Sequence, residues 1–328
     1  MNVPDFISSI SNNAIAGAYA KTWDILGRYF HPLCSVSGGS DSDIVLDIVH
    51  SLDEEHKVRY VWFNTGLEYK ATKQHLDYLE HRYNIHIERV QPVKSVPVCV
   101  KEYGYPFISK LVSQKIHSLQ IHGFDFKDRT FDEDLCLFPQ ANDGLKWWHN
   151  IGTVHIWNID YYKHLKHFLI AYPPQFLISD KCCYYAKKLP AKFFVRDNNI
   201  DLQIIGTRKA EGGIRSVGSA CFSNGKDYDT LRPVFWFNDY DKREYQRMFH
   251  IQHSDCYSVY GLKRTGCAGC PFNRYLFTEQ QLLIGHEDGL LRAAHNVFTQ
   301  VYEYTKLYRS FCAQQGETFS LFQEVSND

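Results

Sequence analysis

Apolar and polar positions in the first hundred residues follow two alternating periods, one typical of strands and one typical of helices. Three short apolar runs are predicted as strands: 33–36, 59–63 and 85–90. Three segments have the apolar spacing of helices: 12–30 with Asn12 or Asn13 as N-cap, a stretch that ends near Ser51, and 67–83. Strands that alternate with helices at this spacing predict a parallel sheet with right-handed crossovers.

The pattern loosens between residues 106 and 180 into short helical pieces, which we interpret as a helical insertion. A strand at 201–206 then continues the sheet, a helix is predicted at 241–251, and helices are predicted from about 278 to the end. The predicted fold class is α/β, a Rossmann-like parallel sheet with helices on both faces. We expect an α/β domain at 1–230 and a small, mostly helical, cysteine-bearing region at 231–328.

The first predicted strand and its helix are joined by a turn that is rich in glycine and hydroxyl side chains. The turn consists of Ser37, Gly38, Gly39, Ser40, Asp41 and Ser42. Glycine lets the backbone bend tightly and approach a ligand, and the N–H groups at the start of a helix attract an anion. An ordinary loop has the same composition, but the position between a strand and a helix favours a site for phosphate or pyrophosphate.

Composition changes this picture only a little. Of the 328 residues, 44% are hydrophobic and 22% are charged, and the net charge of −1 provides no overall attraction for nucleic acid or membranes. One local exception is the stretch 181–215, which contains eight basic residues and three acidic ones. We interpret it either as a binding site for a polyanion or as a solvated basic surface. No secretory signal pattern and no run of about 18 apolar residues occurs, so we expect a cytoplasmic protein that does not enter a membrane.

Four cysteines have the spacing of metal ligands: Cys182, Cys183, Cys267 and Cys270. A CxxC turn directs two sulfur atoms at one ion or cluster, and the tandem pair supplies two more. A [4Fe–4S] cluster suits adjacent cysteines better than zinc does, and a pair of small buried side chains is the simpler alternative. Cys221 is a possible substitute ligand. The remaining cysteines are interpreted as structural, and the histidine pairs His164/His167 and His250/His253 as packing residues on helical faces.

Several motifs together resemble the phosphoadenosine phosphosulfate (PAPS) reductase family, which has the adenine-nucleotide α-hydrolase fold. The turn SGGSDS resembles the SGGxDS signature of PP-loop ATP pyrophosphatases. Four further segments are similar to family motifs: 63–66 (FNTG), 205–215 with Gly206, Arg208, Glu211 and Arg215, 232–237 (RPVFWF), and 260–267 before the CxxCP. The resemblance covers about 15–110 and 180–275. It implies that the α/β domain binds an adenine nucleotide.

The tandem and CxxC cysteines are similar to the arrangement that holds a [4Fe–4S] cluster in adenylyl-sulfate (APS) reductases. Two departures favour another activity. The chain lacks the C-terminal nucleophilic cysteine motif of sulfonucleotide reductases, since its one late cysteine is Cys312, and its glycine turn has the ATP-using form. The chain therefore also resembles the cluster-bearing enzymes of DNA phosphorothioation and tRNA 2-thiolation.

The resemblance implies roles for particular residues. The glycine turn would hold the leaving pyrophosphate of ATP, and Asp41 would help to position Mg²⁺. Asn64, Thr65 and Gly66, with Gly206 from the next strand end, would face the ribose or adenine. Four cations are expected to clamp the phosphates and to stabilise the charge of the transition state: Arg208, Arg215, Lys263 and Arg264.

Three functions follow from these interpretations. The first is an AMP-forming, pyrophosphate-releasing enzyme of sulfur transfer or nucleic-acid modification, with a sulfur donor or acceptor protein and DNA or tRNA as possible partners. The second is a reductase of APS or PAPS. The third is a non-catalytic nucleotide sensor within a larger assembly. We expect Cys312, at the end of a helix, not to act as a nucleophile.

Overall fold

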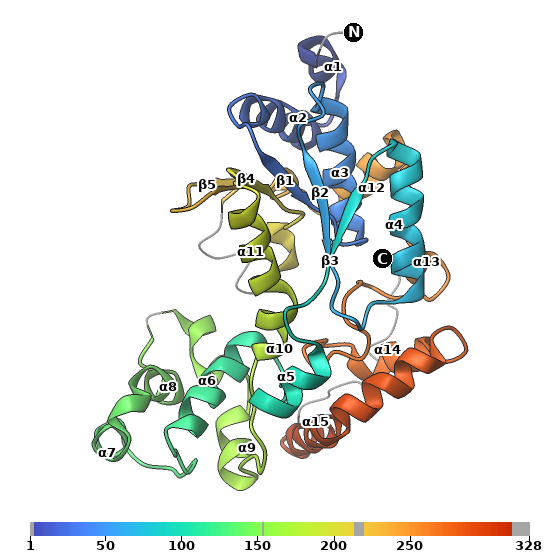
Figure 1. Ribbon diagram of the computed structural model, residues 1–328. Helices are drawn as coiled ribbons and strands as arrows, with labels where there is room; N and C mark the ends of the chain where they lie inside the picture. Colours follow the sequence, from blue (N-terminus) through green and yellow to red (C-terminus); the bar gives the residue numbers. More distant parts are fainter. Residues whose placement is uncertain (1–2, 153, 213–219, 317–328) are drawn as a thin grey trace. The chain divides into compact units, whose positions relative to one another are not determined.

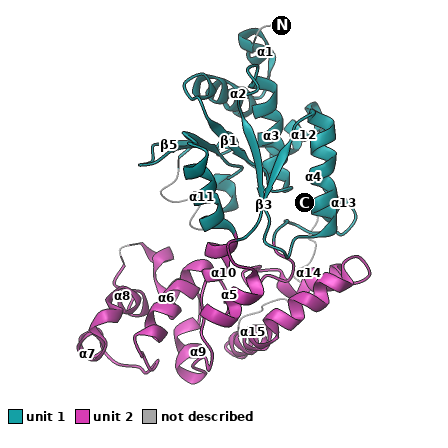
Figure 2. Ribbon diagram, in the orientation of Figure 1, with its two compact units in different colours: residues 1–92, 187–266 teal, residues 93–186, 267–328 magenta. Residues whose placement is uncertain are grey.

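The computed structural model describes residues 3–152, 154–212 and 220–316. The chain forms two compact units, which are coloured separately in Figure 2. Unit 1 consists of Met1–Pro92 and Lys187–Gly266, and unit 2 of Val93–Ala186 and Cys267–Asp328. The sequence led us to expect a boundary at residue 230. The units divide elsewhere, and each combines two separate stretches of the chain.

Unit 1 contains a sheet with the strand order β3-β2-β1-β4-β6-β5 (Figure 1). Its strands are β1 (Pro32–Ser35), β2 (Arg59–Phe63), β3 (Ile87–Val90), β4 (Leu202–Ile204), β5 (Phe222–Ser223) and β6 (Asp229–Leu231). All neighbouring strands run parallel except β5 and β6. The chain order changes direction at β1, which pairs with both β2 and β4, and in parallel sheets such a switch point is where ligands bind.

Helices cover both faces of this sheet. Those of unit 1 are α1 (Val3–Ser9), α2 (Asn13–Leu26), α3 (Ser40–Leu52), α4 (Lys70–Tyr83), α11 (Leu189–Asp197), α12 (Asp239–Met248) and α13 (Asp255–Ser258), with a 3₁₀ turn at Lys209–Glu211. Successive residues of β1 face opposite sides: Cys34 lies in the core that contains α2 and α3, whereas Leu33 packs with Val195 of α11. The predicted fold class is confirmed, and Asn12 caps α2 as expected.

Unit 2 is helical in the part of the chain that the structure describes. Its helices are α5 (Val96–Tyr103), α6 (Lys110–Ile121), α7 (Phe131–Leu137), α8 (Asn142–Trp148), α9 (Leu165–Ala171), α10 (Lys181–Cys183), α14 (Leu276–Leu282) and α15 (Asp288–Gln314). Three 3₁₀ turns lie at Pro139–Ala141, His155–Trp157 and Ile159–Tyr161, and a π-helix at Tyr184–Lys188 crosses the boundary between the units.

The C-terminal helix explains where the units divide. The ring of Tyr308 on α15 lies 5.1 Å from that of Phe168 on α9, and Tyr304 Oη donates a hydrogen bond to the carbonyl of Tyr172 at 2.6 Å. The predicted helical insertion therefore shares one core with the last helix. Sequence order alone does not reveal this, because the two segments lie more than a hundred residues apart.

Some predicted boundaries differ from the structure. The helix predicted at 241–251 is α12, which begins at Asp239 because Asn238 caps it and ends at Met248. The short strands β5 and β6 were not predicted, since two or three residues carry no recognisable period. No helix among the described residues is long and apolar enough to cross a membrane.

Candidate functional site

The glycine turn connects the end of β1 to the first turn of α3. Gly38 has φ +66°, a backbone conformation that side chains disfavour, and a Cβ at this position would lie 2.9 Å from Thr72 Cγ2 on α4. The turn is therefore closely packed against α4. Glycine is required at position 38 for both its conformation and its lack of a side chain.

Gly39, the N-cap of α3, contributes no side-chain cap and leaves a small space above its Cα. The atoms nearest to the position of an added Cβ are Thr265 Oγ1 at 3.0 Å, Ser37 Oγ at 3.2 Å and Tyr257 Oη at 3.6 Å. All three are hydroxyl oxygens. A space lined by hydroxyl groups at the N-terminal end of a helix suits an oxygen of an anion, because hydroxyls and backbone N–H groups both donate hydrogen bonds.

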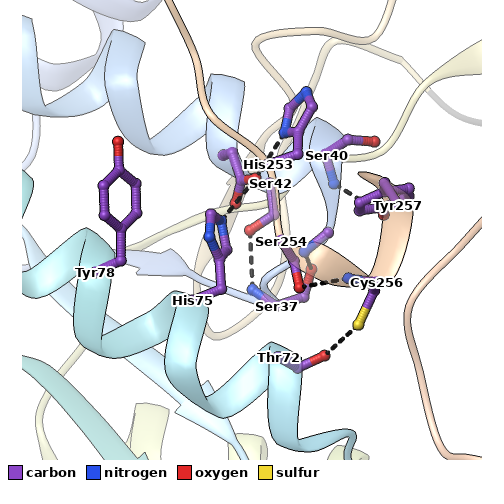
Figure 3. Close-up of polar contacts among 12 residues, drawn as sticks. Ser37, Ser40, Ser42, Thr72, His75, Tyr78, His253, Ser254, Cys256 and Tyr257 are labelled. Atoms are coloured by element: carbon purple, nitrogen blue, oxygen red, sulfur yellow. Dashed lines mark hydrogen bonds and ion pairs between the residues drawn. The ribbon is translucent and has the colours of Figure 1, made fainter. Parts of the chain in front are cut away.

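Hydrogen bonds fix the shape of the turn (Figure 3). Ser42 Oγ accepts from the backbone N–H of Ser37 at 2.9 Å, and Ser37 Oγ accepts from that of Gly39 at 3.3 Å. The N–H of Ser40 donates to Tyr257 Oη at 3.1 Å. Tyr257 lies about 220 residues away in sequence, and no local signal in the sequence indicated that it belongs to this site.

Asp41 is held by two cations at the start of α3. Its Oδ2 accepts from Arg208 Nε at 3.0 Å, and its Oδ1 lies 2.8 Å from Lys242 Nζ. Arg208 is 8% exposed and also donates to Asp239 Oδ1 at 2.8 Å. Burial lowers the pKa of Arg208, but the two carboxylates more than offset this and raise it. Lys242 was missed in the sequence because its charge is unremarkable on a polar helix.

Gly206 brings the loop after β4 against the same turn. A Cβ at position 206 would lie 3.0 Å from the backbone of Asp41 and Ser42, so only glycine permits this approach. The loop carries Arg208 to Asp41 as a result. Gly206 and Arg208, which the sequence predicted as site residues, therefore both lie at the turn. Arg208 was expected to clamp phosphates, and in this structure it contacts the carboxylate of Asp41.

A second carboxylate, which is fully buried, lies two residues further along α3. Asp43 is fully buried, and its Oδ2 accepts hydrogen bonds from His75 Nε2 at 3.0 Å and His253 Nδ1 at 2.9 Å. Burial raises the pKa of Asp43, but the two imidazoles more than offset this and hold it below its usual value. His253 lies in the loop before α13, so its interpretation as a packing residue on a helix is wrong.

The end of β2 carries a smaller polar group. Gly66 has φ +85°, and its N–H donates to Asn64 Oδ1 at 2.8 Å. Thr65 Oγ1 donates to Glu68 Oε1 at 3.0 Å, and this buried carboxylate also pairs with Lys187 Nζ at 3.2 Å. Glu68 and Lys187 were not predicted as members of this group. Asn64 and Thr65 lie at the carboxyl edge of the sheet, as expected.

The other predicted cations have different surroundings. Lys263 and Arg264 are exposed on the loop that leads to Thr265. They directly precede this residue, whose hydroxyl lines the space above Gly39. Arg215 lies outside the described residues. Within the basic stretch 181–215, Lys187 and Arg208 pair with carboxylates of unit 1, and the exposed Arg196 pairs with Asp197.

The four predicted metal-ligand cysteines all lie in unit 2. The pKa of Cys182 is raised by a hydrogen bond with Cys183, by burial, and by the charges of Cys183, Cys270 and Cys267. The four thiols therefore share one neighbourhood. Among the described residues, no three His, Cys, Asp or Glu side chains already form a group that could hold a metal ion.

The CxxC loop is fixed by the last helix. Gly269 has φ +61°, its carbonyl accepts from Tyr302 Oη on α15 at 2.5 Å, and an added Cβ would lie 2.4 Å from that hydroxyl. The tandem cysteines end α10, directly before the π-helix. π-Helical turns are frequent at functional sites.

Two further cysteines are engaged elsewhere. Cys221, the possible substitute ligand, lies in unit 1, where its thiol donates to the carbonyl of Arg232 at 3.3 Å. Cys312 is 0% exposed in the last turn of α15, with its sulfur 3.9 Å from the carbonyl oxygen of Lys163. A thiol without exposure is not accessible to a dissolved substrate.

Comparison with known proteins identifies the region that contains the glycine turn. Residues 31–119 match the family model of the phosphoadenosine phosphosulfate reductase domain. The matched residues include β1, the turn and α3, and end within α6. No curated protein matches the chain.

Three solved structures illustrate the structural similarities. A PAPS reductase from Candida auris in a phosphate complex is 11% identical with TM-score 0.43, covering 79% of this chain and 96% of that one. The Candida glabrata FMN adenylyltransferase with FAD and inorganic pyrophosphate is 12% identical with TM-score 0.40, covering 81% and 68%. The NH3-dependent NAD synthetase of Campylobacter jejuni subsp. jejuni NCTC 11168 in complex with the nitrate ion is 10% identical with TM-score 0.36, covering 98% and 100%.

Proposed function

We propose that this protein binds ATP at the glycine turn and cleaves it at the α-phosphate, releasing pyrophosphate and transferring or releasing AMP. The observation that carries this proposal is the space above Gly39, which three hydroxyl groups line at the N-terminal end of α3. The N–H groups at the start of α3 and the hydroxyls of Ser37 and Ser40 would donate to the leaving pyrophosphate, while Ser42 holds the turn by accepting from the Ser37 N–H. The match to the PAPS reductase domain supports an adenine nucleotide as ligand.

Attack at the α-phosphorus moves negative charge onto the leaving pyrophosphate. Fixed N–H donors and cations stabilise that charge where it develops. Asp41 keeps Arg208 and Lys242 at the start of α3, and phosphate oxygens that approach them would share the two cations with this carboxylate. Lys263 and Arg264, which are exposed on the neighbouring loop, would contribute further positive charge, as would Arg215.

Asp41 is a poor ligand for Mg²⁺ in this arrangement, because a cation already lies against each of its carboxylate oxygens. A magnesium ion held by Asp41 therefore has no part in the proposed reaction. A magnesium ion that accompanies ATP would belong to the substrate. Asn64, Thr65, Gly66 and Gly206, at the ends of neighbouring strands, are the proposed contacts of the adenosine moiety.

Cys182, Cys183, Cys267 and Cys270 are the proposed ligands of a [4Fe–4S] cluster, with zinc as the alternative. Their shared neighbourhood in unit 2 supports this assignment, and four thiolates are the donors that both metals accept. A bound cluster would supply redox or Lewis-acid chemistry to a sulfur atom. The chain's own contribution is the Tyr302–Gly269 hydrogen bond, which fixes the CxxC loop.

The pathway that suits these groups is sulfur transfer or nucleic-acid modification in the cytoplasm. AMP activates an acceptor oxygen for replacement by sulfur, so DNA or tRNA and a sulfur donor or acceptor protein are the proposed partners. A sulfonucleotide reductase is the second candidate, favoured by the description of the matching family model. The burial of Cys312 favours the first candidate, because a reductase needs an accessible nucleophilic thiol.

Product analysis distinguishes the two candidates. The protein, prepared without oxygen, is incubated with ATP and either DNA or tRNA, and separately with APS or PAPS and thioredoxin. Formation of AMP and pyrophosphate in equal amounts supports the first function. Thioredoxin-dependent release of sulfite, with no release of pyrophosphate from ATP, would contradict the first function and support the sulfonucleotide reductase.

A further inference from the structure

The segment 253–265 meets the first turn of α3 at three points, although the matched PAPS reductase domain ends at residue 119. His253 donates to Asp43, and Tyr257 Oη accepts from the N–H of Ser40 (Figure 3). Thr265 Oγ1 lies beside Gly39. All of these residues lie in unit 1.

The segment is also attached to α4. Ser254 Oγ donates to the carbonyl of Ala71 at 3.2 Å, and Cys256 Sγ lies 3.5 Å from Thr72 Oγ1. Thr72 is the residue that packs against Gly38. The position of Tyr257 relative to the glycine turn is therefore fixed from two helices.

The surroundings of the Tyr257 hydroxyl determine where its hydrogen can point. Burial raises the pKa of Tyr257, and the charge of Asp43 acts in the same direction, while contacts with the backbone and hydroxyl of Ser40 and with the Thr265 hydroxyl act to lower it. Lys242 Nζ donates to Ser40 Oγ, which leaves the Ser40 hydroxyl hydrogen for another acceptor. Because the phenol oxygen accepts from the backbone N–H of Ser40, which can only donate, its own hydrogen can be donated to an acceptor such as an anion.

We propose that the hydroxyl groups of Tyr257 and Thr265 bind the pyrophosphate group of the nucleotide, together with Ser37. This inference rests on the proposed function and extends the site to two hydroxyl groups, those of Tyr257 and Thr265, that sequence analysis did not assign. Ser37, Tyr257 and Thr265 form three sides of the space above Gly39, and each supplies an O–H donor that a phosphate oxygen accepts. Asp43 acts as a positioning residue, since it holds His253 at the start of the segment.

The test compares the wild type with Tyr257→Phe and Thr265→Val, each of which removes one hydroxyl and retains the shape of the side chain. Inorganic pyrophosphate and ATP are titrated into each protein in a calorimeter, and circular dichroism verifies the fold. Tyr78→Phe is the control, because Tyr78 lies on α4 and its hydroxyl contacts Arg82.

We expect Tyr257→Phe and Thr265→Val each to bind pyrophosphate about tenfold more weakly than the wild type, because each loses one hydrogen bond to a charged group. The control Tyr78→Phe should bind pyrophosphate as the wild type does. Equal or tighter binding by Tyr257→Phe and Thr265→Val, with normal binding by the wild type, would overturn this inference and leave the proposed function intact. Failure of the wild type itself to bind pyrophosphate and ATP would overturn both.

Discussion

Arg208 donates a hydrogen bond from Nε to Asp41 Oδ2 over 3.0 Å and so joins the loop after β4 to the first turn of α3. Arg208 also reaches Asp239 at the start of α12, so one guanidinium connects three elements around the glycine turn. We predict that Arg208→Ala reduces AMP formation about a hundredfold, the usual cost of removing one group that stabilises developing negative charge.

The assay for this prediction measures pyrophosphate release at saturating ATP. Arg208→Lys should retain part of the activity, because lysine supplies the charge but not a planar pair of donors. Arg196→Ala is the control, since Arg196 is exposed on α11 and pairs with Asp197. Unchanged turnover in Arg208→Ala would contradict the assigned role.

The lowered pKa of Asp43 leads to a prediction of how the stability of the protein depends on pH. Its pKa is held below the usual value, so the folded state gains stability from its charge above the unfolded pKa of about 4, and this gain is lost as the pH falls through the lower folded pKa. Asp43→Asn should reduce the free energy of unfolding at pH 7 by about 3 kcal/mol, because a buried charge interaction is broken.

Urea unfolding of wild type and Asp43→Asn, repeated from pH 7 to pH 3, measures this effect. The difference between the two proteins should narrow at the acidic end. Asp77→Asn serves as the control, because Asp77 is exposed and pairs with Arg89 at the surface. A constant difference across this range would show that the charge of Asp43 is not responsible.

The cysteines of unit 2 predict a metal content. Protein purified without oxygen should be brown and contain iron and sulfide, and Cys182→Ser, Cys183→Ser, Cys267→Ser or Cys270→Ser should lose the colour. Cys136→Ser is the control, because Cys136 is exposed on α7. Elemental analysis that found stoichiometric zinc without iron would refute the cluster and retain the site. If Cys221→Ser loses the metal and Cys182→Ser retains it, Cys221 is a ligand in place of Cys182.

Cys312 should not take part in the chemistry. Its thiol is buried beside Lys163, so Cys312→Ala should retain the turnover of the wild type and lose only about 1 kcal/mol of stability. Mass spectrometry after incubation with APS or PAPS provides the second measurement. A sulfite adduct on Cys312 would promote the reductase to the first candidate.

The features that the sequence predicted well are those with local signals. The first three strands, α3 and the glycine turn were recognisable because each depends on a short run of apolar residues, hydroxyl residues or glycine. Asp43 carried a weaker signal, an acidic residue directly before the apolar run 44–46, which is buried.

The features that the sequence did not predict depend on long-range contacts. Lys242, Tyr257 and Thr265 reach the turn from about 200 residues away, and no periodicity reveals which side chains meet across that separation. The boundary between the units was missed for the same reason, because α15 returns to pack on α9.

The most direct test of the central claim is a calorimetric measurement of ATP binding to wild type, Gly39→Ala and Gly17→Ala. Gly39 has an ordinary φ of −95°, so alanine is compatible with the backbone, but its Cβ would enter the hydroxyl-lined space. Gly17 on α2 has nothing within 4 Å of an added Cβ. We predict that Gly39→Ala binds ATP about ten- to a hundredfold more weakly, whereas Gly17→Ala binds it as the wild type does. Wild-type affinity in Gly39→Ala, or no binding by the wild type, would contradict the account.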